Sequence, residues 1–224
     1  MKRSEINALM RKADNFFNDK RFKLPPWAYW GPEQWKGKRD ECGEVIDRMM
    51  GWDITDFWSD DFLRRGLLLF TIRNGQPGPG NKPYAEKIMV VEENQETPMH
   101  YHWTKMEDIM CRGGGNLVIQ LYNSCNRSQL DSTDVHVSVD GVEITVAAGG
   151  KIVITPGESI CLVPGMFHRF YGEPGKGTVL VGEVSMVNDD SKDNCFYETI
   201  GRFPEIDEDV QPLHLLVSDY AKYV

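Results

Sequence analysis

The sequence predicts a mainly β protein, either a β-sandwich or a barrel, with one helix before it. Short β-type runs separated by turn signals follow one another from residue 84 to residue 186, which is typical of sandwiches and barrels. Before them, apolar residues recur with a helical period over residues 4–18. A chain of 224 residues can bury a sizeable core and is most often one domain. We therefore expect a single domain over residues 1–224, in which an N-terminal arm (1–65) packs on the β-barrel and C-terminal segment (66–224).

The N-terminal arm begins with the clearest helix. Its apolar stripe faces the core and Ser4 can cap its start, and the stripe consists of Ile6, Leu9, Met10, Ala13, Phe16 and Phe17. Two prolines then enforce an extended path over residues 22–30, which carries Trp27, Tyr29 and Trp30. These aromatics are expected to pack on the barrel; the alternative is that one of them lines a sugar pocket. Residues 32–35 form a short helical turn, whereas residues 52–57 fit either a strand or a short helix.

The β region is bounded by turn signals. Asp140-Gly141 predicts a hairpin, and the three glycines at 113–115 predict a tight or bulged turn that needs positive φ. The acidic segment 188–209 is expected either on the surface or folded back over the barrel mouth, and residues 212–223 as a strand followed by a short turn or helix. The expected strands cover residues 67–73, 85–92, 100–104, 116–122, 134–139, 143–146, 151–155, 159–163, 167–171 and 178–186.

Composition excludes several classes of function. The formal net charge of -9 argues against nucleic acid and anionic membranes as partners, because phosphate contacts need a basic face. No apolar run reaches transmembrane length, and the N-terminus lacks the apolar core of a signal peptide. The five cysteines are scattered and form no CxxC motif, a pattern typical of a reduced, cytoplasmic protein.

One short motif points to a metal. His100 and His102 are two residues apart, so a β-strand would present both imidazoles on one face. Glu107 could return an oxygen to the same ion after a short bend. Two nitrogens and a carboxylate suit Mn, Fe, Co, Ni or Zn rather than Ca or Mg. His168, just after the Pro164-Gly165 turn, would complete a set of three histidines and one carboxylate, although it could also be an ordinary core histidine.

Two charged residues interrupt apolar strands. Glu183 lies in the run 178–186, where a carboxylate is costly unless it is paired or functional. An antiparallel hairpin about the turn at 173–177 would place Glu183 near His168. Lys87 lies in the run 85–92, and the alternation of the strand alone does not decide whether it points inward.

These stretches resemble the two motifs of the cupin superfamily, His-x-His…Glu…Gly and Gly…Pro-Gly…His. The chain as a whole resembles the D-lyxose isomerase family. The stretches that carry this resemblance are Leu24-Pro25-Pro26-Trp27, residues 91–95 with Thr97-Pro98-Met99-His100-Tyr101-His102, Lys105-Met106-Glu107-Asp108-Ile109, Gly113-Gly114-Gly115-Asn116-Leu117, Gly182-Glu183-Val184-Ser185 with residues 188–190, and Gly201-Arg202-Phe203-Pro204. The resemblance implies a cupin jelly-roll barrel with the metal inside, usually a homodimer with Mn(II), and aldose-ketose isomerisation.

Interconverting D-lyxose and D-xylulose, or D-mannose and D-fructose, moves a proton between C1 and C2 through a cis-enediol. On this view His100, His102, Glu107 and His168 hold Mn²⁺, for which Co²⁺, Fe²⁺ or Zn²⁺ could substitute. Lys105 serves the sugar oxygens as a donor or acid, and Glu183 and Glu205 are both candidates for the carbon-side base. Sugar hydroxyls are expected to bind Lys87, Asp193 and Arg202. The alternatives are an Fe(II)-dependent cupin dioxygenase and a non-catalytic sugar-binding cupin.

Overall fold

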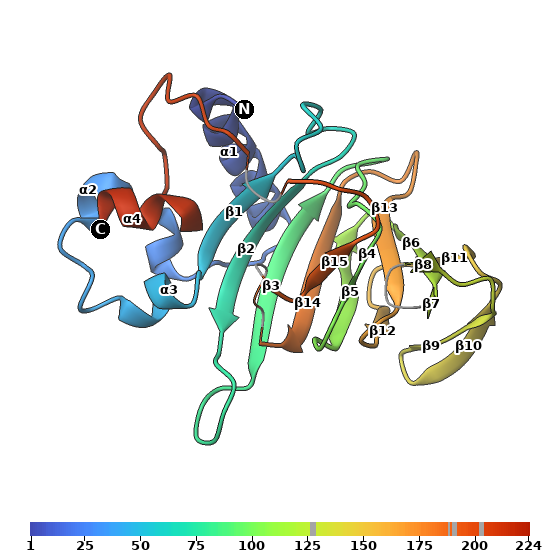
Figure 1. Ribbon diagram of the computed structural model, residues 1–224. Helices are drawn as coiled ribbons and strands as arrows, with labels where there is room; N and C mark the ends of the chain where they lie inside the picture. Colours follow the sequence, from blue (N-terminus) through green and yellow to red (C-terminus); the bar gives the residue numbers. More distant parts are fainter. Residues whose placement is uncertain (126–128, 188, 190–191, 202–203) are drawn as a thin grey trace.

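The computed structural model describes residues 1–125, 129–187, 189, 192–201 and 204–224. Two antiparallel sheets face each other (Figure 1), one of eight strands and one of five. A two-stranded ribbon, β7 (Ser124–Cys125) with β8 (Gln129–Leu130), lies beside them. The predicted mainly β architecture with one long N-terminal helix is confirmed.

The eight-stranded sheet holds the first three strands of the chain, β5 from its middle and four strands from its second half. Neighbours in this sheet are antiparallel throughout. In spatial order its strands are β1 (Gly51–Thr55), β2 (Leu67–Asn74), β3 (Tyr84–Val91), β14 (Val179–Met186), β5 (Glu107–Gly114), β12 (Ser159–Leu162), β9 (Val135–Val139) and β10 (Val142–Val146).

The five-stranded sheet carries the histidine motif near one edge. The strand at that edge comes from residues 194–196 of the acidic segment, so this part of the segment folds back onto the barrel. In spatial order the strands are β11 (Lys151–Ile154), β6 (Leu117–Tyr122), β13 (Phe167–Gly172), β4 (His100–His102) and β15 (Asn194–Phe196).

The main core fills the space between the two sheets. Strands of both sheets alternate, so that every second side chain points inward. Met89 and Val181 enter this core from the large sheet, and Ile119 and Phe170 enter it from the small one. Most inward positions are apolar, and the exceptions gather at one end of the space between the sheets, where the site described below lies.

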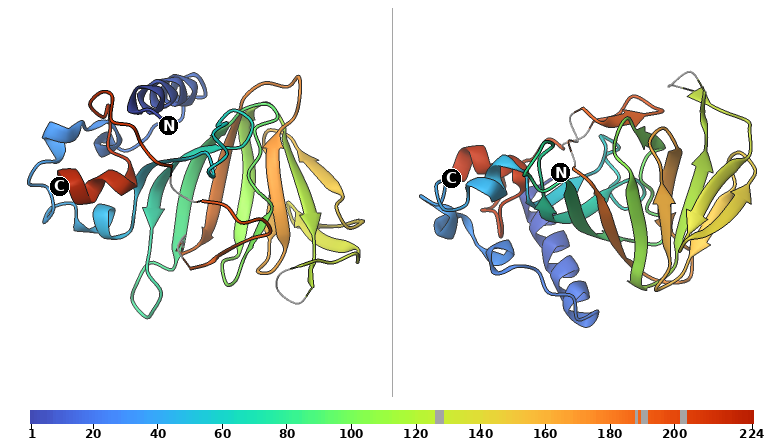
Figure 2. Two further views of the ribbon diagram at one scale, coloured as in Figure 1. Left: turned by 45° about the horizontal axis from the view of Figure 1, so that its top comes forward. Right: turned by 90° about the horizontal axis from the view of Figure 1, so that it is seen from below.

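Helix α1 (Arg3–Asp19) covers the outer face of the large sheet (Figure 2). Its stripe of Ile6, Met10, Ala13 and Phe17 packs on outward side chains of β1, β2, β3 and β14. The helix begins one residue earlier than expected. Ser4 is therefore not its cap; instead, the carboxylate of Asp209 accepts hydrogen bonds from the backbone N–H and the hydroxyl of Ser4.

The remaining helical segments gather beside β1, at the edge of the large sheet (Figure 1). The N-terminal arm packs there against the C-terminal segment and the large sheet: the Trp35 ring lies 5.1 Å from that of Tyr220, and the Trp27 ring lies 5.0 Å from that of Phe70. This is the packing role expected for the arm. The segments are the 3-10 turns η1 (Pro26–Tyr29) and η2 (Val217–Asp219) and the short helices α2 (Pro32–Trp35), α3 (Gly43–Asp47) and α4 (Tyr220–Tyr223).

Buried charge joins the two ends of the chain. Arg3 is fully buried and donates two hydrogen bonds of 2.8 and 2.9 Å to Asp219 and two of 2.8 Å to Glu208. Burial would lower the pKa of Arg3, but Glu208 and Asp219 outweigh it and raise the pKa above its usual value. A paired, hydrogen-bonded guanidinium of this kind fixes α1 against the C-terminal segment.

Two local expectations were wrong. Residues 107–114, which were not expected as a strand, form β5, because they pair on both sides with β14 and β12. Residues 212–216 form no strand: Leu216 makes only one isolated bridge, to Trp52, and the chain turns into η2 directly afterwards. No helix in the described part of the chain is both long and apolar enough to cross a membrane.

Candidate active site

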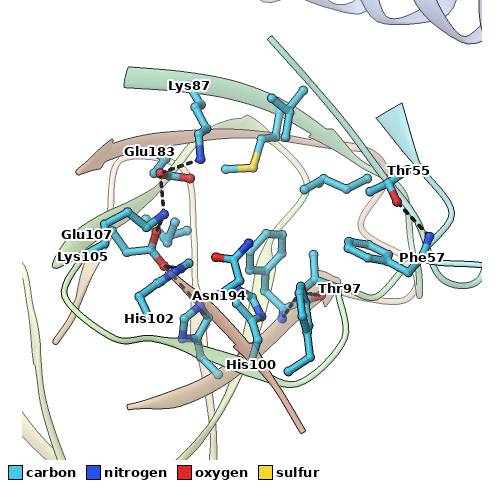
Figure 3. Close-up of a pocket in the computed structure, with 17 residues that line it drawn as sticks. Thr55, Phe57, Lys87, Thr97, His100, His102, Lys105, Glu107, Glu183 and Asn194 are labelled. Atoms are coloured by element: carbon cyan, nitrogen blue, oxygen red, sulfur yellow. Dashed lines mark hydrogen bonds and ion pairs between the residues drawn. The ribbon is translucent and has the colours of Figure 1, made fainter. Parts of the chain in front are cut away.

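Polar and aromatic side chains line a cavity between the two sheets (Figure 3). Lys87, Lys105, Glu107 and Glu183 lie at one end, and Thr55 and Phe57 lie at the other. The lining comes from both sheets, from the turn between β4 and β5, and from the segment after β1. It consists of Thr55, Phe57, Leu67, Leu69, Lys87, Met89, Thr97, His100, His102, Lys105, Glu107, Ile109, His168, Phe170, Glu183, Asn194 and Phe196.

Three histidines converge in this cavity. His100 and His102 lie on β4, and His168 on β13 is the direct cross-strand partner of His100. The rings of His100 and His168 are 4.3 Å apart, and one ligand nitrogen from each of the three residues lies within 4.8 Å of the others. The two-residue spacing thus places both imidazoles of the motif on one face, as expected.

Backbone carbonyls fix the protonation of two of these rings. His100 Nδ1 lies 2.8 Å from the carbonyl oxygen of Pro98, and His168 Nδ1 lies 3.0 Å from that of Met166. Only an N–H can bond to a carbonyl, so Nδ1 carries the proton and Nε2 presents its lone pair to the cavity. This is the arrangement of histidines that bind a metal ion through Nε2.

Glu107 adds a carboxylate to the three histidines, and together they form a candidate cation site. Its Oε1 lies 3.1 Å from His168 Nε2 and 3.3 Å from His102 Nε2, and His168 Nε2 is buried without a hydrogen-bond partner. Burial would raise the pKa of Glu107, but Lys105 and then His102 overcome it and hold that pKa well below its usual value. A buried carboxylate next to imidazole lone pairs is unfavourable by itself, and a cation bound between these atoms would stabilise the arrangement.

The histidines are also ready to bind a metal at neutral pH. Burial, followed by the neighbouring His168 and His102, lowers the pKa of His100 well below 6.5. Burial likewise lowers the pKa of His102. Both rings are therefore neutral near pH 7, which is the form that ligates metal ions.

Next to the histidines lies a network of buried ion pairs. Lys105 Nζ lies 2.6 Å from Glu107 Oε2 and 3.0 Å from Glu183 Oε1. Lys87 Nζ and the hydroxyl of Ser185 approach the same oxygen of Glu183 at 3.2 and 3.0 Å. Burial would raise the pKa of Glu183, but Lys105 and then Lys87 lower it below its usual value. Glu183 is therefore an ionised carboxylate in an almost dry place.

Asp193 organises the turn between β4 and β5. Its Oδ1 accepts hydrogen bonds from the N–H and the hydroxyl of Thr104 at 2.9 and 2.7 Å, and its Oδ2 accepts one from the N–H of Lys105 at 3.1 Å. Oδ2 also lies 3.7 Å from His102 Nδ1. Both oxygens of Asp193 are thus directed at the segment that carries Lys105.

The structure brings most of the candidate residues together, though not all. Lys87 points inward and contacts Glu183. Glu183 is buried and paired, as a carboxylate within an apolar strand requires. The predicted hairpin was wrong, because β13 and β14 belong to different sheets and the cross-strand partners of Glu183 are Lys87 and Ile109. Glu205 is exposed and lies apart from the cavity, where its backbone carbonyl accepts a hydrogen bond from the amino group of Met1. Arg202 lies outside the described residues.

Some lining residues were not expected from the sequence. Ser185 could have been found, because it lies two residues after Glu183 on the same strand and so on the same face. Asn194 and Phe196 gave no such signal, because nothing in the acidic segment predicted a strand beside β4. Phe57 follows a strand that could not be told from a short helix in the sequence.

Comparisons with known proteins show which family this chain is similar to. A family model described as D-lyxose isomerase matches residues 1–220. A D-lyxose/D-mannose isomerase of Serratia proteamaculans is 49% identical over 227 residues, and one of Escherichia coli O157:H7 is 45% identical over 227 residues; each alignment covers 100% of both chains.

Among solved structures, an L-ribose isomerase mutant of Acinetobacter sp. DL28, in complex with L-ribose, superposes with a TM-score of 0.62. The superposition covers 92% of this chain and 98% of that one, at 13% identity. At this identity the likeness concerns the fold alone, and it confirms the predicted fold class.

Proposed function

This chain belongs to the D-lyxose isomerase family, and we propose that it interconverts D-lyxose with D-xylulose, and D-mannose with D-fructose, in the cavity between its two sheets. The observation that carries this proposal is the position of Glu183. It is a buried, ionised carboxylate held by two lysines beside a three-histidine cluster. Aldose-ketose isomerisation needs a base of this kind next to an electrophile that holds the sugar oxygens.

We propose that His100, His102, Glu107 and His168 hold one divalent metal ion, Mn²⁺ by preference, with Co²⁺, Fe²⁺ or Zn²⁺ as possible substitutes. Three imidazole nitrogens and one carboxylate form a donor set that suits these ions. Support comes from the two histidines whose Nδ1 atoms are bound to carbonyls and from the buried Nε2 of His168, which faces Glu107. When bound, the ion polarises the carbonyl of the sugar and holds its neighbouring hydroxyl.

The side chains beside the histidines move the protons. Glu183 takes the proton from the carbon next to the carbonyl and returns it one carbon along, passing through a cis-enediol. Its ionised state at neutral pH suits a base. Lys105 donates to the sugar oxygens as charge moves between them, because its ammonium lies between Glu107 and Glu183.

The remaining candidates take narrower roles in this proposal. Lys87 holds Glu183 in place and is close enough to the cavity to bind a sugar hydroxyl. Asp193 acts through Lys105, whose backbone it holds, rather than through the sugar. Glu205 is not assigned the role of base, because it is exposed and does not line the cavity. Arg202 stays a prediction.

The test is to incubate the purified protein with D-lyxose and with D-mannose while ketose formation and oxygen uptake are followed together. The proposal predicts ketose from both sugars without oxygen consumption. Oxygen uptake with Fe(II) would instead support the dioxygenase alternative. Sugar binding without turnover under any metal would support the non-catalytic alternative.

We further propose that the enzyme works as a cytoplasmic homodimer. The family resemblance supports the dimer. The five cysteines, none of them in a disulfide, fit a reducing compartment. The single-domain organisation over residues 1–224 also stays a prediction.

A further inference from the structure

The end of the cavity opposite the ion pairs is aromatic. Figure 3 shows Phe57 and Thr55 across the cavity from Lys87 and Glu183. The ring of Phe57 lies 6.2 Å from that of Phe196, and Phe196 lies 5.3 Å from His100. These two steps place the Phe57 ring no more than about 11.5 Å from the His100 ring. The aromatic end of the cavity thus lies within this limit of the histidine cluster.

The backbone that presents Phe57 has an unusual conformation. Phe57, Trp58 and Asp60 have φ angles of 52°, 61° and 53°, in the left-handed region that residues other than glycine avoid. Side-chain oxygens stabilise this turn: Thr55 Oγ1 accepts from the N–H of Phe57 at 2.9 Å, and Asp56 Oδ1 accepts from the N–H of Trp58 at 3.1 Å. Unfavourable backbone of this kind persists where surrounding contacts hold it, and it clusters at ligand sites.

The turn places the ring of Phe57 in the cavity. The side chain of Phe57 is 7% exposed and lines the cavity, whereas the adjacent Trp58 is 67% exposed and does not line it. The two neighbours share one backbone conformation but differ in what they contact. The chain therefore accepts an unfavourable conformation to put one aromatic ring against the space that the sugar would occupy.

We propose that Phe57, supported by Phe196, is the specificity-determining wall for the end of the sugar remote from C1 and C2. This inference rests on the proposed isomerase function. The reacting carbons must lie beside Glu183 and the histidines, so the other end of the sugar points toward the aromatic end. D-mannose differs from D-lyxose by one terminal hydroxymethyl carbon at that end. Phe57 therefore limits how well the site accepts a hexose relative to a pentose.

The test compares kcat/KM for D-mannose with kcat/KM for D-lyxose in three Phe57 variants. Phe57→Ala removes the ring and keeps the backbone cost, and we expect it to raise the hexose-to-pentose ratio by about fivefold or more, within the range that one carbon contributes in an apolar pocket. Phe57→Gly removes the ring and also relieves the backbone, and it should raise the ratio equally. Phe57→Trp fills the space and should lower the ratio.

Trp58→Ala is the matched control, because it changes the next side chain in the same left-handed turn without changing the lining of the cavity; its ratio should stay at the wild-type value. An unchanged ratio in Phe57→Ala and Phe57→Gly, or a change in Phe57→Gly alone, would overturn the proposal. The second result would assign the effect to the backbone rather than to the ring.

A binding measurement covers the case in which a variant turns over slowly. Calorimetric titration of the Mn²⁺-loaded protein with D-arabinitol and with D-mannitol should show the same shift in relative affinity toward the six-carbon polyol in Phe57→Ala and Phe57→Gly. Wild-type protein that isomerises neither sugar would refute the proposed function and this inference with it. Wild-type protein that isomerises both sugars, together with Phe57 variants whose ratio is unchanged, would refute only this inference.

Discussion

Lys105 and Glu183 meet in the interior, with Nζ of the lysine 3.0 Å from Oε1 of the glutamate and both side chains almost fully buried. The same ammonium lies 2.6 Å from Glu107. One positive charge thus lies between Glu107, the proposed metal ligand, and Glu183, the proposed base. This position is where a donor to the sugar oxygens is needed, because charge moves between them during isomerisation.

Replacing Lys105 should separate metal binding from turnover. Lys105→Met removes the donor and keeps much of the side-chain volume, whereas Lys105→Ala removes both. In either variant kcat should fall by a factor of about 10² or more. Titration with Mn²⁺ should still show one bound ion. The matched control is Lys87→Met, which removes the other lysine on Glu183 and leaves Lys105 in place, so its loss of kcat should be smaller. Full activity in Lys105→Ala would remove this residue from the mechanism.

The two glutamates proposed as the base can be separated directly. Glu183→Gln keeps the shape and loses the basic oxygen, so kcat should fall by about 10²–10⁴-fold. The exchange of the carbon-bound proton of D-lyxose with solvent deuterium, followed by NMR, should disappear as well. Glu205→Gln changes an exposed residue outside the cavity and should leave both measurements unchanged. The opposite pattern would assign the base to Glu205 and require its side chain to enter the cavity.

Asp193 should affect the rate rather than sugar affinity. Asp193→Asn weakens the hydrogen bonds that hold the N–H groups of Thr104 and Lys105. A small displacement of Lys105 should lower kcat by about 10- to 100-fold, with KM within about twofold of wild type. A large rise in KM with unchanged kcat would instead support a direct contact between Asp193 and the sugar.

The matched control for Asp193 is Glu198→Gln. Glu198 lies two residues after β15 and pairs with Arg65 at 2.8 Å, so this variant loosens the same segment without touching Lys105. It should leave kcat near the wild-type value. An equal loss of kcat in both variants would indicate that the segment as a whole, and not the carboxylate of Asp193, is responsible.

The histidines predict how the metal-free protein responds to pH. The pKa values of His100 and His102 lie below 6.5 in the folded state, so near and below pH 6.5 the unfolded chain binds more protons than the folded chain. Stability should therefore fall as pH falls from 7.5 to 5.5. Urea unfolding of chelator-treated protein should show this slope, and His100→Gln should reduce it.

Two comparisons check the source of that pH dependence. His136→Ala changes an exposed histidine on β9 and should leave the slope unchanged. Added Mn²⁺ should raise the melting temperature most at pH 7.5 and least at pH 5.5, because protons compete for the same nitrogens. A metal effect that is independent of pH would argue against histidine ligands.

The metal motif was the part of the site most open to prediction from sequence. His100 and His102 share a face because strands have a period of two, and that rule acts within three residues. The contact between Glu183 and Lys87 depends on which strands become neighbours. Apolar alternation does not specify that order, and the hairpin inferred from the turn at 173–177 joins two different sheets.

The rest of the cavity depends on long-range packing. β15 reaches β4 from about ninety residues further along the chain, and its composition resembles that of a surface loop. Phe57 enters the cavity because three residues adopt left-handed angles, and ordinary propensities disfavour such angles outside glycine. Sequence patterns describe local preferences. The pairing of β15 with β4 and the left-handed turn at Phe57 both go against those local preferences.

The measurement that tests the central claim most directly is the dependence of isomerisation on metal occupancy. Protein stripped with chelator would be titrated with Mn²⁺ while bound metal and ketose formed from D-lyxose are measured in the same samples. We predict no activity at zero occupancy, a rise in proportion to bound Mn²⁺ that ends at one ion per chain, and neither binding nor activity in a variant that carries both His100→Ala and His168→Ala. Full isomerase activity in the metal-free protein, or Mn²⁺-dependent activity in the double variant, would contradict the account.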